Sequence, residues 1–405
     1  MIHNLKVREI DITDPRQRKR FITVPWKIYR GDRYWVPPLI GERMEFLDPG
    51  KNESFEHLDA AFFVAEGYVT PSQGAGQAAA QKPGTPAPPG REQTLGSIGA
   101  FVNHRHNEFH EENVGFFGFF EAANDYQVVE ALLQTACDWV RERGVTAIRG
   151  PASFTGNDDA YGTLIDGFDS RPVVLMSYNP PYYPEMIERF GFGKAMDLWA
   201  WHVDMTVLGT DARNLPPKLL RVVELVRQRS GVHLRRADSM DWDDLVAQIK
   251  KIYNLAWERN WGFVPFTDAE IDHVADGLKQ FADMGIVFLA EIDGEPVGFS
   301  LPLPDMNIAV HHMNGRMLPF GWAKYLWYKR KVDWVRVFAL GVIKEYRGRG
   351  IDALLYYETA KASIARGYQH AEMSWILENN DMMNRAIKMF GAEIYKTYRI
   401  YEKAL

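Results

Sequence analysis

The 405-residue sequence contains a single cysteine, Cys137, so no disulfide can form within the chain. This cysteine falls on the apolar side of a helical pattern with Val129, Leu133 and Val140, which favours a core thiol over a nucleophile. No stretch is long and apolar enough to cross a membrane, and the first residues lack the apolar core of a signal peptide. These absences predict a cytoplasmic protein without a membrane span.

Positive charge is not in excess either. The chain carries 47 lysine and arginine residues against 53 aspartate and glutamate residues, a formal net charge of −6. Because a general nucleic-acid binder needs a basic surface to neutralise phosphates, this balance predicts no nucleic-acid partner but leaves room for a local basic site. The length predicts two or three domains with ample core.

The two halves of the chain contain a weak internal repeat. Similar short segments recur 223 to 228 positions apart: Val7 with Leu234, Pro37 with Pro265, Phe63 with Phe288 and Gly144 with Gly367. The separation changes only where the first half carries extra residues, at about 71–94 and at 158–185. A steady separation that is broken only by two visible insertions indicates a duplicated unit.

The first of these insertions is rich in proline, glycine, alanine and glutamine. Such a composition cannot bury enough apolar surface to offset the entropy lost on ordering. The insertion at about 71–94 is therefore predicted to be a disordered loop within a hairpin.

Each half follows one plan: a short strand, one or two helices, a hairpin, a strand–turn–helix–strand unit, a short helix and a closing strand. The hairpin is clearest in the second half, where Asp293-Gly294 supplies a two-residue turn between apolar strands. The pattern predicts a mixed α/β (α+β) fold. We expect one domain at 1–205, a linker helix within 206–231 and a second domain at 232–405.

Residues 345–358, EYRGRGIDALLYYE, place two glycines and two arginines directly before a helical pattern. A helix start exposes unpaired N–H groups and the positive end of the helix dipole, so it attracts anions. Glycines let that backbone approach a phosphate closely, and arginines add charge-assisted hydrogen bonds. The alternative is that Gly348 and Gly350 only shape a tight turn. The stretch alone leaves both interpretations open.

The stretch LGVIKEYRGRGID resembles the motif of the GCN5-related N-acetyltransferase (GNAT) superfamily, in which an apolar-Val strand end runs into Arg/Gln-x-x-Gly-x-Gly/Ala and a helix. The order of elements extends this resemblance over about 232–405, and the repeat extends it to 5–205. The chain thus resembles a tandem of two GNAT folds. It departs from the motif at Asp352, where the family has Gly or Ala.

The resemblance implies a CoA-dependent N-acyltransferase, with acetyl as the expected group. It would move the acyl group from acetyl-CoA or another acyl-CoA to the amine of a small molecule or peptide. The resemblance also implies three sets of coenzyme contacts: pyrophosphate at Arg347, Gly348, Arg349, Gly350 and Ile351, pantetheine at Leu340 and Val342, and a further contact at Asn380.

The first copy lacks these features. Its matching turn, FFEAANDYQVV, has no glycine and places Glu121 and Asp125 where phosphates would lie. Because carboxylates repel a pyrophosphate, we interpret the first half as a degenerate copy that is structural or shapes the acceptor pocket.

Acyl transfer to an amine requires a base, a donor that polarises the carbonyl and a proton for the leaving sulfur. The candidate bases are Glu291, Glu378 and Asp381, although carboxylates in such positions are more often solvated or ion-paired. The tyrosine that the family often uses as general acid is replaced by Ile387. Water, Tyr395 or Tyr398 would have to protonate the thiolate instead.

Four further features have two interpretations each. Arg336 either orients a substrate carboxylate or forms an ion pair on the sheet. The aromatic and basic segment at 307–334 either closes over an acyl chain or touches a membrane, or it packs on its own domain. His104 and His106 would share one strand face, as metal ligands or as surface residues. The polar, glycine-rich loop at 150–168 would line the acceptor cleft between the halves, with Asn157, Asp158 and Tyr161 as candidates, although nothing identifies what they hold.

Three other functions compete with acyl transfer. A non-catalytic acyl-CoA sensor would explain both Ile387 and Asp352. GRGIDA also fits a Gly-x-Gly-x-x-Ala dinucleotide fingerprint, but that motif opens a parallel doubly wound domain, and only 55 residues follow here. Aminoacyl-tRNA-dependent transferases pair two such folds as well, but they use no CoA, so the glycine turn argues against them.

Overall fold

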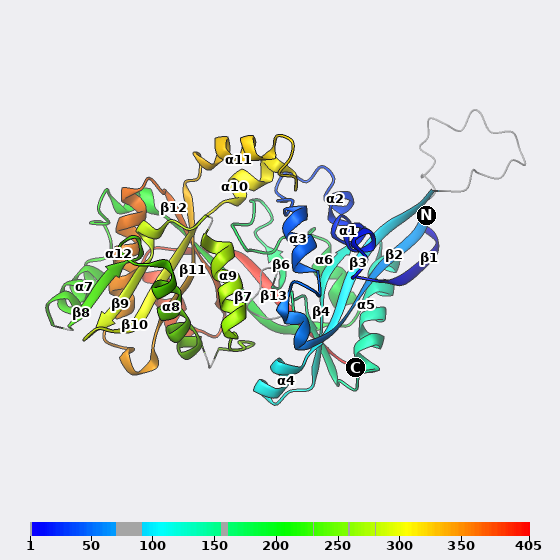
Figure 1. The fold of residues 1–405 in the computed structure, drawn as a ribbon, viewed down its shortest axis with the longest axis horizontal. Helices are drawn as coiled ribbons and strands as arrows, with labels where there is room; N and C mark the ends of the chain where they lie inside the picture. The colour runs from blue at the N-terminus through cyan, green and yellow to red at the C-terminus, as the bar shows by residue number, and fades with distance from the viewer. Residues whose placement is uncertain (1, 70–90, 155–160, 230, 258–259, 280) are drawn as a thin grey trace, which may run out of the picture.

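The structure is a computed structural model that describes residues 2–69, 91–154, 161–229, 231–257, 260–279 and 281–405 (Figure 1). The strands are β1 (Ile2–Ile10), β2 (Leu58–Val69), β3 (Arg91–Asn103), β4 (Val114–Ala122), β5 (Ala147–Gly150), β6 (Thr163–Asp166), β7 (Gly193–Asp204), β8 (Val232–Arg236), β9 (Phe288–Ile292), β10 (Glu295–Pro304), β11 (Trp334–Val342), β12 (His370–Leu377) and β13 (Glu393–Ala404). The α-helices are α1 (Pro15–Ile22), α2 (Pro25–Ile28), α3 (Ile40–Phe46), α4 (His104–His110), α5 (Tyr126–Arg141), α6 (Tyr183–Arg189), α7 (Pro217–Arg229), α8 (Trp242–Trp257), α9 (Asp268–Lys279), α10 (Asn307–Val310), α11 (Gly321–Lys329), α12 (Ile351–Ala365) and α13 (Asp381–Met389).

The strands join into one mixed sheet in the order β1-β2-β3-β4-β5-β13-β7-β12-β11-β10-β9-β8, with β6 paired to β13. Each half contributes a run of antiparallel neighbours that ends in one parallel pair, β4 with β5 and β11 with β12. The order is mirrored on either side of the central β13-β7 pair. This arrangement confirms the predicted mixed α/β fold and its tandem plan, whose two halves lie side by side in Figure 1.

The closing strands of the two halves are exchanged. β13, at the end of the chain, pairs with β5 of the first half, and Tyr401 lies opposite Gly150. β7, at the end of the first half, pairs with β12 of the second half, and His202 lies opposite Glu372. β7 and β13 also pair with each other. The sheet therefore crosses the domain boundaries that the sequence suggested, and those boundaries remain a prediction.

Helices cover both faces of the second half of the sheet. Leu340 on β11 faces the core beneath α12, with Leu355 and Ala290. Its neighbour Ala339 faces the opposite core, with Ile252 on α8. Since successive strand residues point to opposite faces, this alternation places β11 between the two helices.

Two local predictions were wrong. The hairpin insertion was placed at about 71–94, but β3 begins at Arg91 and pairs with β2; residues 71–90 lie outside the described part of the chain. His104 and His106 do not share a strand face, because both belong to α4. The Asn103 side chain caps this helix by accepting a hydrogen bond from the amide of His106.

The aromatic segment after β10 forms α10 and α11, which lie at the outer edge of the molecule at the top of Figure 1. Its base is attached to the first half. The Trp26 indole donates to Oδ1 of Asn314 at 3.0 Å, and the Ile40 amide donates to the carbonyl of Gly315 at 3.0 Å. A side chain at Gly315 would collide with Trp26, so the two segments fit closely only with glycine there.

Candidate active site

β11 and β12 separate partway along their length. They pair in parallel from Trp334 and His370 to Val337 and Met373. Beyond that point β11 continues along β10 as far as Val342, while β12 continues along β7. Because the two strands stop pairing while both remain in the sheet, a gap opens between them.

A cleft of about 910 Å³ occupies this gap and extends between the two halves. Its floor is formed by residues on both separated strands, among them Arg336, Phe338, Leu340, Ser374, Trp375 and Ile376. One end is lined by Tyr356, Asn380, Met383 and Ile387. Elsewhere it is bounded by first-half residues such as Trp35, Glu42 and Tyr178, by α9, and by Met313 and Tyr325 of the α10–α11 segment.

The turn before α12 leaves its backbone amides exposed to a ligand. Gly348 and Gly350 have φ of +75° and +79°, a region that side chains disfavour, and no side chain caps the helix at Gly350. The amides from Gly348 to Ala353 find no hydrogen-bond acceptor within the described part of the chain. Unpaired amides at the positive end of a helix dipole form a site suited to an anion.

The corresponding turn of the first half has filled this position with its own carboxylates. The Asp125 side chain caps α5 by accepting from the amide of Gln127 at 2.9 Å. Glu121 accepts hydrogen bonds from the hydroxyls of Tyr29 and Tyr183. The contrast between a capped α5 and an uncapped α12 agrees with a first copy that is degenerate.

The two arginines of the turn have different surroundings. The Arg347 guanidinium donates to the carbonyl of Val342 at 3.0 Å and to that of Ala256 at 2.6 Å, so it ties β11 to the end of α8. The Arg347 amide donates to the Lys344 carbonyl. The Arg349 side chain is exposed and lies over the ring of Tyr346.

Of the predicted coenzyme-binding residues, Leu340 and Asn380 line the cleft. Asn380 also caps α13 by accepting from the amide of Met383 at 3.2 Å. Val342 and Ile351 are buried in the core beneath α12. The coenzyme contacts of this whole set remain a prediction, and the turn and the cleft are the two features that would bring them together.

None of the three predicted bases lines the cleft. Glu291 on β9 pairs at 3.0 Å with Arg235 on the edge strand β8. Glu378 pairs with Lys194 at 2.7 Å, and Asp381 is exposed in the first turn of α13. Their role as bases remains a prediction that the geometry does not favour.

A buried carboxylate that the sequence reasoning missed lies directly beneath the cleft floor. Glu372 on β12 is fully buried and accepts hydrogen bonds from the hydroxyls of Ser374 and Tyr395. Burial raises the pKa of Glu372 to about 7, while Arg336 opposes the shift. Ser374, whose hydroxyl donates to Glu372, is itself one of the residues that line the cleft. The alternation of Glu372 and Ser374 with apolar residues in HAEMSWIL was the available signal.

Arg336 does not extend into the cleft to meet a free carboxylate. Its Nε donates to Oγ of Ser374 at 3.0 Å, and its Nη2 donates to the Ser374 carbonyl at 3.1 Å. Its Nη1 donates to the carbonyls of Val174 and Leu175, in the first half, at 2.9 and 3.0 Å. The guanidinium therefore fixes Ser374 and joins the two halves under the cleft.

A tyrosine approaches the position where the family places its general acid. Ile387 on α13 and Tyr356 on α12 both line the same end of the cleft. The Tyr356 hydroxyl contacts Sδ of Met383, one helical turn before Ile387, at 2.6 Å. Burial, with a smaller contribution from Asp352, raises the pKa of Tyr356, so this hydroxyl stays protonated. Neither Tyr395 nor Tyr398 is among the residues that line the cleft.

An apolar pocket of about 80 Å³ adjoins the cleft. It lies between α8, α9 and the sheet, and its lining includes Leu245, Ile249, Ala275, Phe299 and Leu301. Five residues line both the pocket and the cleft: Tyr253, Val274, Leu278, Phe338 and Ala339. The pocket is thus a hydrocarbon-lined branch of the cleft.

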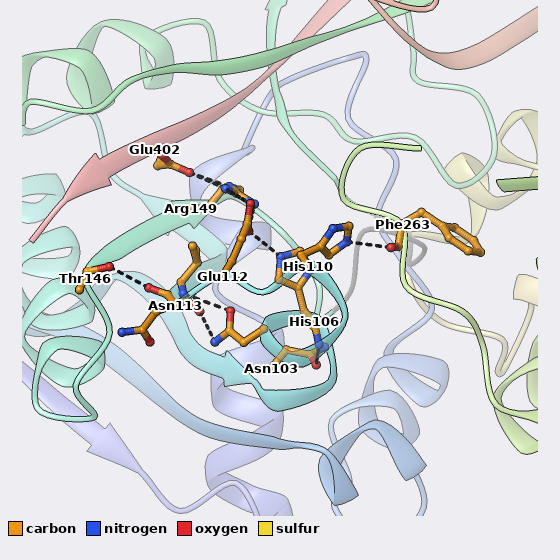
Figure 2. A network of polar contacts seen from close by, with 11 residues as sticks. Asn103, His106, His110, Glu112, Asn113, Thr146, Arg149, Phe263 and Glu402 are labelled. Atoms are coloured by element: carbon orange, nitrogen blue, oxygen red, sulfur yellow. Dashed lines mark hydrogen bonds and ion pairs between the residues drawn. The ribbon is translucent and has the colours of Figure 1, made fainter. Parts of the chain in front are cut away.

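Figure 2 shows a polar network around α4. Nε2 of His106 lies 3.1 Å from Glu112, and Arg149 pairs with both Glu112 and Glu402 of β13. His110 contacts the carbonyl of Phe263 at 2.8 Å. Burial lowers the pKa of His106 to about 4, so the ring is neutral at pH 7. The network joins the two halves, which makes it structural.

The described residues contain neither a metal-binding cluster nor a helix fit to cross a membrane. No group of three or more His, Cys, Asp or Glu side chains in that part of the chain is arranged to hold a metal ion. Among the same residues, no helix has both the length and the apolar character that a membrane crossing requires.

Comparisons with known proteins give the following likenesses. No model of a protein family matches the chain. Protein YghO of Escherichia coli (strain K12) is 36% identical over 394 residues, which are 96% of this chain and 93% of YghO. The bacterial ceramide synthase of Caulobacter vibrioides is 35% identical over 410 residues, which are 99% of this chain and 98% of that protein.

Solved structures resemble the fold at low sequence identity. A tandem GNAT protein from the clavulanic acid biosynthesis pathway has a TM-score of 0.51 at 12% identity, covering 99% of this chain and 98% of that one. The GCN5-related glucosamine N-acetyltransferase region of a fungal β-N-acetylglucosaminidase has a TM-score of 0.52 at 15% identity, covering 99% of this chain and 38% of that one. The chain therefore belongs to the same family as YghO and the C. vibrioides bacterial ceramide synthase, and its fold is that of the tandem GNAT proteins.

Proposed function

We propose that this protein is an acyl-CoA-dependent N-acyltransferase whose acceptor is an amine with a long aliphatic chain. The observation that carries the proposal is the separation of β11 from β12 beside an uncapped helix start. An acyl-CoA has a diphosphate, which matches the uncapped helix start, and an extended amide-containing arm, which matches the free strand edge of β11.

The diphosphate would bind the amides from Gly348 to Ala353. The arm would then run along the free edge of β11 past Leu340, where strand amides that lack a partner can pair with its own amides. Asp352 is the one unfavourable group. It adds a negative charge in the first turn of α12, which predicts weaker coenzyme binding than a neutral residue would give.

The proposed proton path uses Glu372, which acts through Ser374, and Tyr356. The acceptor N–H proton passes to Oγ of Ser374 while the Ser374 hydroxyl proton passes to Glu372, whose pKa of about 7 suits a base near neutral pH. The C–N bond forms and the C–S bond breaks, and the leaving thiolate takes the hydroxyl proton of Tyr356. Solvent later returns the proton from Glu372 to Tyr356.

The acceptor's chain would occupy the apolar pocket between α8 and α9. A hydrocarbon chain gains about 0.8 kcal/mol for each methylene removed from water, so the pocket rewards long-chain amines. The name of the C. vibrioides relative supports this acceptor, because a ceramide is the amide of a fatty acid with a long-chain amino alcohol.

Calorimetry and turnover assays test this proposal separately. We expect calorimetry to detect binding of acetyl-CoA or a fatty acyl-CoA to the full chain, and thiol release to accelerate when long-chain amino alcohols are added. Ala275→Trp fills the pocket and should raise KM for long-chain amines about tenfold or more, while short-chain amines serve as the internal control.

Four outcomes would contradict the proposal. If neither CoA ester binds, the coenzyme assignment is wrong. If a CoA ester binds but no amine is acylated, the protein is an acyl-CoA sensor. If turnover requires charged tRNA and no CoA, it belongs to the aminoacyl-transferring class. A chain-length preference that Ala275→Trp leaves unchanged would place the acceptor chain elsewhere.

A further inference from the structure

The outer side of α11 and the turn before it form an exposed apolar surface, which we call the α11 face. It comprises Leu318, Phe320, Trp322, Leu326 and Trp327, which are between 51% and 74% exposed. These are five of the thirteen large hydrophobic residues found exposed in the described chain. Monomeric proteins rarely gather apolar side chains on a surface in this way without a binding role.

The opposite side of the same segment is already buried and fixed. Met313 and Tyr325 line the cleft, and His312 stacks on Tyr328 with ring centres 3.5 Å apart. Hydrogen bonds to Trp26 and Ile40 attach the segment to the first half. The segment therefore has an anchored inner side. The sequence-based option of a helical insertion that packs its aromatic residues on its own domain is wrong for Trp322 and Trp327, which are exposed.

Charge around the α11 face has one sign. No aspartate or glutamate occurs from residue 306 to residue 332, although the whole chain has a net charge of −6. The same stretch holds five exposed basic residues: Arg316, Lys324, Lys329, Arg330 and Lys331. Within the described residues, none of the five lies within ion-pair distance of a carboxylate.

The combination of exposed tryptophans, exposed leucines and unpaired basic residues fits an anionic bilayer surface. Tryptophan prefers the boundary between headgroups and acyl chains, and lysine stems can lie along apolar surface with the ammonium group among the headgroups. A second copy of the chain fits less well, because a twofold interface would bring two identical basic clusters together. α11 has nine residues, so it can only lie in the plane of the surface.

We propose that the α11 face docks on an anionic lipid surface. The docked helix would lie between the bilayer and the cleft, because Tyr325 on its inner side lines that cleft. An amine with an aliphatic chain would then reach the cleft from the membrane without crossing water. This last step rests on the proposed function, whereas docking itself requires no acyl transfer.

Vesicle sedimentation with the full chain and no substrate tests the docking. We expect binding to phosphatidylglycerol-containing vesicles at least about tenfold stronger than to pure phosphatidylcholine vesicles, weakening as salt is added. The variant with Trp322→Ser and Trp327→Ser should lose binding to both vesicle types by at least about tenfold. Phe109→Ser, an exposed aromatic residue on α4 at the bottom of Figure 1, is the matched control and should bind as the native chain does.

A second variant removes charge instead of apolar surface. Lys329→Gln with Lys331→Gln should weaken binding to anionic vesicles about 25-fold, with little effect on binding to neutral vesicles, since each basic residue near such a surface contributes about fivefold. Circular dichroism and thermal unfolding should show that these exposed substitutions leave the fold intact.

Three results would overturn the proposal. One is failure of the native chain to bind anionic vesicles, and another is binding that neither variant weakens. The third is a dimer in sedimentation velocity that the tryptophan variant dissociates, because the occupant would then be a second copy. Docking and acyl transfer fail independently, since the first is measured without substrate and the second with a dissolved short-chain amine.

Discussion

The assignment of Glu372 as the base leads to a specific prediction for Glu372→Gln. Glutamine keeps the size and the hydrogen-bonding carbonyl of glutamate but cannot take up a proton. We expect kcat/KM for amine acylation to fall about 10²- to 10⁴-fold, the usual contribution of a positioned base. Binding of acyl-CoA should be unchanged, because Glu372 lies beneath the cleft floor and does not line the cleft.

The pH dependence of kcat/KM for amine acylation gives the test that is most specific to this site. With a pKa of about 7, Glu372 is about 10% ionised at pH 6 and about 90% ionised at pH 8, so the base-dependent rate should rise about tenfold over that interval. The charged groups around it are Arg336 on β11, Lys396 on β13 and Asp305 after β10. The rise should disappear in Glu372→Gln, while any further rise caused by the acceptor ammonium should remain.

A stability measurement provides a second, independent magnitude. The pKa of Glu372 is raised in the folded state, so the unfolded chain holds fewer protons than the native chain between pH 4.5 and about 7. The free energy of unfolding therefore decreases as pH rises through that window, by up to about 3 kcal/mol. Glu372→Gln should remove this dependence, so the stability of the variant relative to the native chain should be higher at pH 8 than at pH 5.

Two control variants separate the base from its surroundings. Ser374→Ala keeps the carboxylate but removes its hydroxyl link to the cleft, so it should lower kcat without shifting the coenzyme affinity. Asp305→Asn alters another buried carboxylate whose pKa is about 7 but which is not among the cleft residues. Because the charge of Asp305 helps to raise the pKa of Glu372, the rise in rate should persist in this variant but move to lower pH. A rise near pH 7 that remains in Glu372→Gln, or a profile without any rise in Asp305→Asn, would refute the assignment.

Three further predictions concern the coenzyme turn, the leaving group and the network of Figure 2. Gly350→Ala places a Cβ 2.7 Å from Cγ2 of Val226 at a φ of +79°. Acyl-CoA binding should weaken, and the free energy of unfolding should fall by about 2–4 kcal/mol. Adding Val226→Ala should recover only the part of this loss that the collision with Val226 causes. Tyr356→Phe should lower kcat about tenfold or more with unchanged calorimetric acyl-CoA affinity, while Tyr357→Phe should leave both unchanged. Because the folded-state pKa of His106 is lowered to about 4, thermal unfolding should show stability falling as pH drops from 6.5 to 4, and His106→Gln should flatten that slope.

The local order of elements was predictable from the sequence because it depends on short-range patterns. The hairpin turn at Asp293-Gly294, the strand before residue 343 and the glycine turn before α12 all follow from alternation and from residues that tolerate positive φ. The exchange of β7 and β13 was not predictable in this way. Apolar and polar residues alternate in the same way in both strands. No local pattern therefore specifies whether each strand pairs with β5 or with β12.

The candidate site was predictable only in part. The glycines of the turn carry a local signal, because their conformation excludes most other residues. Glu372 carries a weaker one, since its effect depends on burial by β7 and β13, and the latter supplies Tyr395 from 23 positions away. The three carboxylates chosen from the sequence have other surroundings: Glu291 and Glu378 form ion pairs with Arg235 and Lys194, and Asp381 lies exposed in the first turn of α13. A local pattern does not show which carboxylate the fold brings to the cleft.

The degenerate first half nevertheless forms part of the site. Its closing strand β7 lies along β12 and supports the strand that carries Glu372 and Ser374. Its carbonyls at Val174 and Leu175 hold Arg336, which in turn holds Ser374 beneath the cleft. It also supplies one wall of the cleft and the anchor of α11. A copy that gave up the anion site by capping its own helix can therefore remain essential, because the second copy's cleft is incomplete without it.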